Sequence, residues 1–230
     1  MRNMPKLCLL LLLMGLYSEV HAQQPMRDFF GVNVFKCQEA PEDIQKVAQW
    51  IRDYARWEWI EPVNNQYQFR QAVGGMDYDA YYQQLHALDI QSLFVVMKSP
   101  AWISAGKDSE NPAEYAPSGE QDGLQPEHYK EAAEFYYQLA ARYGKQKIEE
   151  KHLFTDDKRS GLGWMDVIEA DNEPDGVWGR QMSLEQYAAL LNAVYDGNGG
   201  TLKGNYGIKA ADPDMPVSIK LVRASARRPL

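Results

Sequence analysis

The side chains with the clearest chemical potential are those of residues 171–175, Asp-Asn-Glu-Pro-Asp. They follow a short apolar run, residues 164–170, that predicts a β-strand. Pro174 cannot donate to a sheet and favours extended geometry at Glu173, so the strand is predicted to end here. A carboxylate at the carboxyl end of a strand lies where α/β proteins carry catalytic groups. Glu173 is therefore a candidate for a chemical role, and a solvated turn residue is the alternative.

The elements that must position Glu173 are predicted to alternate between strand and helix, which favours a parallel sheet with right-handed crossovers. The predicted strands are residues 28–35, 54–59, 90–97, 164–170 and 217–222, and the predicted helices are residues 41–54, 76–88, 126–143 and 183–195. The fold class is α/β, the N-terminal part of a (β/α)8 TIM barrel with about four to five βα units. A doubly wound sheet is the alternative, but no glycine-rich phosphate loop supports it.

The N-terminus has the pattern of a secretory signal peptide. Arg2 and Lys6 precede a leucine-rich run, and small residues stand before a cleavage site after Ala22. The apolar run is too short to span a bilayer comfortably, so no transmembrane segment is predicted. The predicted organisation is a signal peptide at residues 1–22 and a partial catalytic barrel at residues 23–230, secreted or periplasmic.

The net charge and the cysteine content limit which classes of partner and which kinds of site the chain can have. Removing the signal peptide changes the net charge from −8 to −9, because Arg2, Lys6 and Glu19 leave with it. An acidic chain argues against nucleic acid and anionic membranes, and it is compatible with a neutral polysaccharide. Only Cys37 remains, so neither an intrachain disulfide nor a cysteine zinc site is predicted. No metal or other cofactor is expected, and the sequence leaves the oligomeric state open.

Four tryptophans fall at or just after the predicted carboxyl ends of strands. They are Trp57, Trp59, Trp102 and Trp178. Sugar rings have apolar faces that exposed aromatic side chains contact, so these four are candidate substrate-binding residues, with core packing as the alternative for each. Trp50, on a predicted helix, and Trp164, early in a predicted strand, are expected in the core.

The Asn-Glu-Pro at residues 172–174 resembles the fourth-strand motif of the clan-A glycoside hydrolases. Further segments are similar to secreted polysaccharide-degrading members of the Bacteroidetes type: residues 29–33, 57–59, 99–102, 140–144 and 160–163. The resemblance implies a TIM barrel and a retaining, double-displacement hydrolysis of β-linked poly- or oligosaccharides.

The same resemblance implies roles for individual residues. Glu173 would be the general acid/base and Asn172 would contact the sugar 2-hydroxyl. Arg56, on the second predicted strand, would hold the nucleophile or the asparagine, although a structural ion pair fits it equally well. Asn33, near the carboxyl end of the first strand, is a further substrate-binding candidate.

The sequence departs from the clan at the nucleophile. A retaining enzyme needs two carboxyl groups about 5–5.5 Å apart, and in this clan the second is a glutamate at the end of the seventh strand. After Glu173 come 57 residues, whose single glutamate, Glu185, lies in a predicted helix. The nucleophile is thus missing from this chain. We expect the N-terminal part of a longer hydrolase with little or no turnover, and the alternative is a non-catalytic carbohydrate-binding protein or an inactive fragment.

The expectation of a longer product is tested in the gene. The nucleotide sequence is translated in all three frames from codon 210 to beyond the codon for Leu230. We expect another frame to encode further apolar strands and a strand-end glutamate. If no frame does so, the expectation of a longer product is wrong, and the non-catalytic carbohydrate-binding protein becomes the favoured interpretation.

Overall fold

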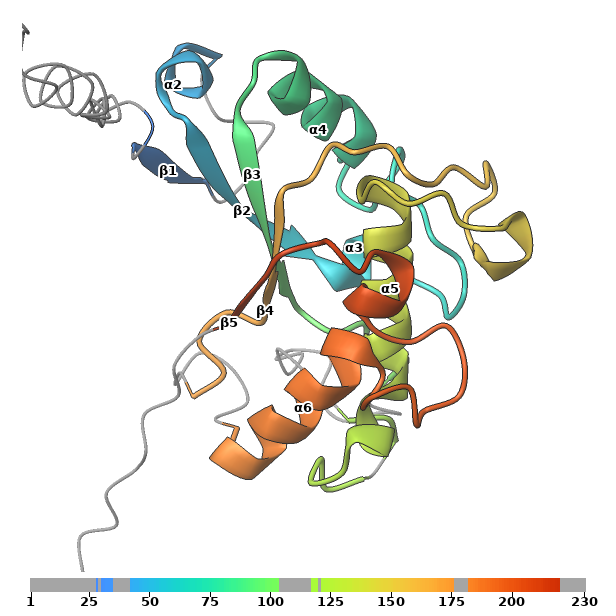
Figure 1. Ribbon diagram of the computed structural model, residues 1–230. Coiled ribbons are helices and arrows are strands. Elements are labelled where there is room, and N and C mark those ends of the chain that lie inside the picture. The colour runs from blue at the N-terminus through green and yellow to red at the C-terminus, as the bar shows by residue number, and fades with distance from the viewer. Residues whose placement is uncertain are drawn as a thin grey trace, which may run out of the picture.

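The sheet has five parallel strands in the order of the chain (Figure 1). The computed structural model describes residues 28, 30–34, 42–103, 117–119, 121–175 and 182–219. The strands are β1 (Gly31–Val34), β2 (Trp50–Arg56), β3 (Gln91–Met97), β4 (Val167–Ala170) and β5 (Val217–Ile219), and each pairs in parallel with the next. In a doubly wound sheet the strand order reverses partway across the sheet, so it does not follow the order of the chain throughout. The predicted α/β class is confirmed, and the sequential order is consistent with part of a TIM-barrel-like fold.

Among the described residues, the three longest helices lie on one face of this sheet (Figure 1). They are α4 (Tyr78–Ala87), α5 (Lys130–Tyr143) and α6 (Leu184–Asp196). The shorter helices are α2 (Glu42–Val47), α3 (Trp57–Ile60) and α7 (Ile208–Ala211), with 3-10 turns η3 (Pro126–Tyr129) and η4 (Glu150–His152). The described residues include no helix that is both long and apolar enough to cross a membrane.

Helix α6 begins as its sequence predicts. The Ser183 hydroxyl accepts a hydrogen bond from the Gln186 backbone N–H at 3.2 Å, and the Gln186 side chain accepts from the Ser183 N–H at 3.0 Å. This capping box satisfies two backbone donors of the first turn. Gly197 ends the helix at a φ of 69°, a left-handed conformation that glycine adopts without a Cβ clash.

The boundary between the first helix and the second strand is a correction to the sequence prediction. The helix expected over residues 41–54 ends at Val47, and β2 begins at Trp50 and ends at Arg56. Trp50 is therefore on a strand. The buried Ile51 fits the helical spacing of apolar residues in the predicted helix and also the alternating pattern of β2. The sequence therefore did not show where the helical period gives way to the strand period.

Strand β1 differs from its prediction as well. Residues 28–35 have the apolar run of a strand buried on both faces, yet only Val34 of the shorter β1 is buried. The structure pairs β1 with β2. The predicted strand at residues 164–170 likewise starts later, at Val167, so Trp164 lies before it and packs against the core.

The two faces of β2 have different surroundings, and this determines which side chains can reach the site. Ile51, Asp53 and Ala55 are buried, and the Tyr82 hydroxyl on α4 donates to Asp53 Oδ2 at 2.6 Å. These residues therefore face the helices. Because side chains alternate along a strand, Arg52 projects from the opposite face.

A charged network lies inside the helix layer. The Arg142 guanidinium on α5 donates to both oxygens of Asp79 on α4, at 2.8 and 2.6 Å, and also to Asp157. Burial acts to lower the pKa of Arg142, but the hydrogen bonds that it donates to Asp79 and Asp157 outweigh burial and raise that pKa above its ordinary value. The same contact holds the pKa of Asp157 down at about 2. Two helices are thereby joined through a bidentate pair.

Removing one member of this network should be costly. Asp79→Ala removes the more buried of the two carboxylates that pair with Arg142, and with it the acceptor of the Tyr143 hydroxyl, and is expected to lower the free energy of unfolding by about 2 kcal/mol in urea titrations. Glu149→Ala, which removes an exposed pair with Lys151, is the matched control and should cost less than about 1 kcal/mol. Equal, small losses in both variants would show that the network does not hold the helix layer together.

Candidate functional site

The turn after β4 carries the predicted catalytic residue in a strained backbone. Asp171 has a φ of 74° and Glu173 a φ of 55°. Such conformations cost non-glycine residues about 1–3 kcal/mol each and concentrate at functional sites. Pro174 had predicted an extended Glu173, and this is corrected: the strand ends at Ala170, so the Glu173 backbone follows the turn.

Helices α5 and α6 hold this turn from the buried side. The Asp171 backbone N–H donates to the Tyr136 hydroxyl at 3.3 Å, and the Tyr187 hydroxyl donates to the Ala170 carbonyl at 3.1 Å. Asp171 is 0% exposed, and its Oδ1 accepts from the Asn172 N–H at 2.5 Å. The turn therefore has fixed contacts on its inner side.

The two residues that follow Asp171 are presented differently. Asn172 is half-buried and Glu173 is exposed. An exposed carboxyl beside a held amide has access to a ligand from solvent. The roles predicted for Asn172 and Glu173 stay predictions.

Arg52 is the residue that holds Asn172. Its Nη2 donates to Asn172 Oδ1 at 3.0 Å and to Glu169 Oε1 at 2.5 Å, and its Nε donates to Glu169 Oε2 at 3.1 Å. Glu169 lies on β4, so the guanidinium spans from β2 across β3. A bidentate guanidinium–carboxylate pair fixes orientation as well as adding energy.

The charge of this pair is well compensated. Burial acts to lower the pKa of Arg52, but the hydrogen bond and the charge of Glu169 outweigh it and raise that pKa above its ordinary value. The side chains of Arg52 and Glu169 are 19% and 4% exposed. Arg52 is therefore cationic at every accessible pH, and it gives Glu169 the positive partner that a buried carboxylate requires.

Asn33 joins the same cluster from β1. Its Oδ1 accepts from Arg52 Nη1 at 3.2 Å, and its Nδ2 donates to the Tyr54 hydroxyl at 3.0 Å. The Arg52 guanidinium also lies over the Tyr54 ring, 4.7 Å from its centroid. The structure thus brings together two of the predicted site residues, Asn33 and Asn172, through one arginine.

Arg56, the arginine that the sequence had favoured, makes other contacts. It forms an ion pair with Glu58 and lies over the Trp59 ring, 4.8 Å from the centroid. The arginine in contact with Asn172 is Arg52, four residues earlier. Sequence reasoning missed it because residue 52 was assigned to a helix. Had β2 been started at residue 50, alternation would have placed Arg52 on the face opposite the buried Ile51.

The predicted aromatic residues divide between core and surface. Trp57 is 0% exposed, its ring lies 4.9 Å from that of Phe135, and its Nε1 donates to Glu61 Oε2 at 2.6 Å. A side chain enclosed in this way does not meet a ligand, which corrects its predicted role. Trp59 and Trp102 are half-buried. Trp178 lies outside the described residues, as do the signal peptide and the last predicted strand residues, 220–222.

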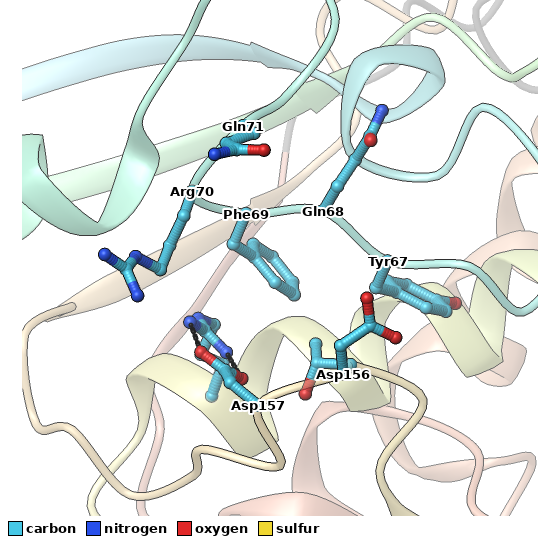
Figure 2. Close-up of a pocket in the computed structure, with 9 residues that line it drawn as sticks. Tyr67, Gln68, Phe69, Arg70, Gln71, Asp156 and Asp157 are labelled. Carbon is cyan, nitrogen blue, oxygen red and sulfur yellow. Dashed lines mark hydrogen bonds and ion pairs between the residues drawn. The ribbon is translucent and has the colours of Figure 1, made fainter.

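Two pockets of about 260 Å³ lie away from this cluster. Figure 2 shows the first, where Tyr67 and Phe69 face Asp156 and Asp157. The second lies at the amino ends of β2, β3 and β4, the opposite end of the sheet from Glu173. Neither pocket includes Asn172 or Glu173. We place the candidate site by its chemistry, at the carboxyl end of β4.

Metal chemistry has no apparent ligand set in the described part of the chain. No three His, Cys, Asp or Glu side chains gather there closely enough to hold an ion. The oxygen-rich cluster around Glu169 is occupied by the Arg52 guanidinium.

Comparison with solved structures shows a distant likeness in fold. No protein-family model and no curated protein matches the chain. Among solved structures, it is similar to a family 39 glycoside hydrolase from the gut symbiont Bacteroides cellulosilyticus WH2, with 17% identity and a TM-score of 0.49. The match covers 82% of this chain and 30% of that one. A likeness of this degree is too weak to assign an activity.

The Arg52–Glu169 pair can be tested by stability. Arg52→Met removes the cation that pairs with the buried Glu169 and should lower the free energy of unfolding by about 3 kcal/mol, whereas Arg52→Met with Glu169→Leu should recover most of that loss. Arg56→Met, which breaks a more exposed pair, is the control and should cost less than about 1 kcal/mol. A double variant as unstable as the single one would contradict the pairing.

Proposed function

We propose that this chain carries the acid/base half of a secreted, retaining glycoside hydrolase that acts on β-linked poly- or oligosaccharides. The observation that carries the proposal is the strained turn after β4, which exposes Glu173 beside an Asn172 amide held by Arg52. Strain retained at a strand's carboxyl end, next to a positioned polar group, favours a site over a passive turn.

The amide geometry supports the role proposed for Asn172. Its Oδ1 accepts from Arg52, so its amide N–H groups remain as the donors suited to a sugar hydroxyl. A hydrogen bond to the 2-hydroxyl would strengthen as positive charge develops on the ring, which lowers the barrier rather than only adding affinity. Arg52 is then a positioning residue that acts through Asn172.

Glu173 would transfer protons in both steps. In the first, the bond between the anomeric carbon and the leaving oxygen breaks, that oxygen takes the Glu173 proton, and a carboxylate nucleophile bonds to the carbon. In the second, Glu173 takes a proton from water, whose oxygen displaces the nucleophile. We do not assign the nucleophile to a residue of this chain, since Glu169, the nearest buried glutamate in sequence, is engaged by Arg52.

Two further features fit a carbohydrate substrate. The net charge of about −9 after loss of the proposed signal peptide suits a neutral polymer better than an anionic one. Trp102, half-buried and next to the end of β3, remains a candidate aromatic contact. Secretion follows from the signal-peptide pattern at residues 1–22 and belongs to the same proposal.

Variants at the two site residues test this function. With a panel of β-linked oligosaccharides, Asn172→Ala should weaken calorimetric binding by about tenfold through loss of one hydrogen bond, while Glu173→Gln should leave binding nearly unchanged. Any hydrolysis should fall at least about 100-fold in Glu173→Gln, because the proton donor is gone. Glu185→Gln, an exposed change on α6, is the matched control.

Two outcomes would contradict the proposal. Oligosaccharide binding that Asn172→Ala leaves unaltered would remove Asn172 from the site. Hydrolysis that persists in Glu173→Gln would assign the acid/base to another residue. Hydrolysis that depends on Glu173 would separate the proposal from the non-catalytic carbohydrate-binding alternative, whereas binding without hydrolysis is expected of both, because no nucleophile is assigned to this chain.

A further inference from the structure

The turn that follows α6 contains the single asparagine–glycine pair of the sequence, Asn198-Gly199. Residues 197–200 all have positive φ, of 69°, 55°, 63° and 75° in order. Glycine adopts this region freely, and asparagine is one of the few other residues that tolerate it. Asn198 is half-buried and Gly199 is exposed, so water reaches the pair.

These two residue types in this order can undergo deamidation. The Gly199 nitrogen loses its proton to hydroxide and bonds to the side-chain carbonyl carbon of Asn198, and the bond from that carbon to Nδ2 breaks with release of ammonia. Water then opens the cyclic imide at either carbonyl and leaves aspartate or isoaspartate. Glycine favours the first step because it has no side chain to hinder its nitrogen. Water is the only co-reactant, and nothing is oxidised or reduced.

Asp196 binds the nitrogen that would attack. Its Oδ1 accepts a hydrogen bond from the Gly199 N–H at 2.7 Å, and its backbone carbonyl accepts from the Gly200 N–H at 3.1 Å. A hydrogen bond to a carboxylate is stronger than one between neutral groups. The negative charge also opposes loss of the Gly199 proton, because a second negative charge would form beside it. Asp196 therefore acts against the first step of the reaction.

Thr201 binds the other reacting group. Asn198 Nδ2 donates to Thr201 Oγ1 at 2.9 Å, and the Thr201 hydroxyl donates to the backbone carbonyl of Asn198 at 2.8 Å. Because that carbonyl takes the hydroxyl proton, the side-chain group that contacts Oγ1 must be the NH2 of Asn198. The amide is thus fixed by a residue outside the pair. Turning its carbonyl carbon onto the Gly199 nitrogen must break this contact.

We propose that Asn198 is a deamidation site that Asp196 and Thr201 keep unreactive while the turn is closed, so that the reaction proceeds when the turn opens. The products would affect α6. Aspartate at position 198 adds a negative charge just beyond the carboxyl end of the helix, where the macrodipole disfavours it. Isoaspartate lengthens the backbone of the tight turn by one carbon. This inference is independent of the proposed function.

The direct test is mass spectrometry of the full chain during incubation at about pH 8, which follows the peptide that contains Asn198, together with an assay of released ammonia. We expect the folded chain to deamidate at least about tenfold more slowly than the same chain unfolded in guanidinium chloride, because two hydrogen bonds must break first. This comparison needs no variant.

Variants at the two holding residues then test the mechanism. Asp196→Ala removes the carboxylate and Thr201→Val removes the hydroxyl. Each should raise the deamidation rate of the folded chain about fivefold, the factor that one hydrogen bond of ordinary strength supplies. Thermal unfolding establishes that each variant is folded during the incubation.

Two further variants are matched controls, and both should react at the rate of the unaltered chain. Thr201→Ser retains the hydroxyl. Asn192→Ala changes an exposed side chain of α6, whereas the contact of Asn192 with the turn is made by its backbone carbonyl, which accepts from the Asn198 N–H at 2.7 Å.

Equal deamidation rates in the folded and the unfolded chain would overturn the proposal. A folded Asp196→Ala or Thr201→Val chain that deamidates no faster than the unaltered chain would also overturn it.

Discussion

The ion pair between Arg52 and Glu169 is the contact on which the candidate site depends. Glu169 is almost fully enclosed, so its charge would be very costly without a cation, and Arg52 supplies that cation from a strand two positions away in the sheet. Once the guanidinium is fixed by two hydrogen bonds to this carboxylate, its remaining donors point at Asn33 and Asn172. The arginine that compensates the buried charge of Glu169 therefore also orients the Asn172 amide at the site.

The strain after β4 fits this arrangement. A turn with two non-glycine residues at positive φ persists only where its surroundings determine it. Here the surroundings are the Tyr136 and Tyr187 hydroxyls on the helix side and Arg52 on the opposite face. Glu173 lies exposed between these supports. A rigid frame with one exposed carboxyl is what proton transfer to a bound ligand needs, because the catalytic group must be held within hydrogen-bond reach of the reacting atom.

The sequence predicted the sheet, the order of the elements and the end of β4, because apolar runs, caps and a proline encode these locally. It failed where two periodicities overlap: Ile51 completes a helical stripe and also begins an alternating strand, so Arg52 was placed on a helix and Arg56 was favoured instead. The prediction that Trp57 contacts a ligand also failed, because this side chain is buried. Its ring neighbour Phe135 comes from another helix, and no local pattern predicts such a contact. Glu169 could have been noticed as a carboxylate inside an apolar strand, which demands a partner.

We propose that the Asn172 amide, held by Arg52, contacts a sugar. The most direct measurement is an NMR titration of the Asn172 side-chain amide with soluble β-linked oligosaccharides of several backbone types. We expect one class of oligosaccharide to shift both Asn172 amide protons until they saturate, and the Arg52 Nε–H resonance to move at the same ligand concentrations. Saturable shifts elsewhere in the chain while Asn172 and Arg52 stay unchanged would contradict it.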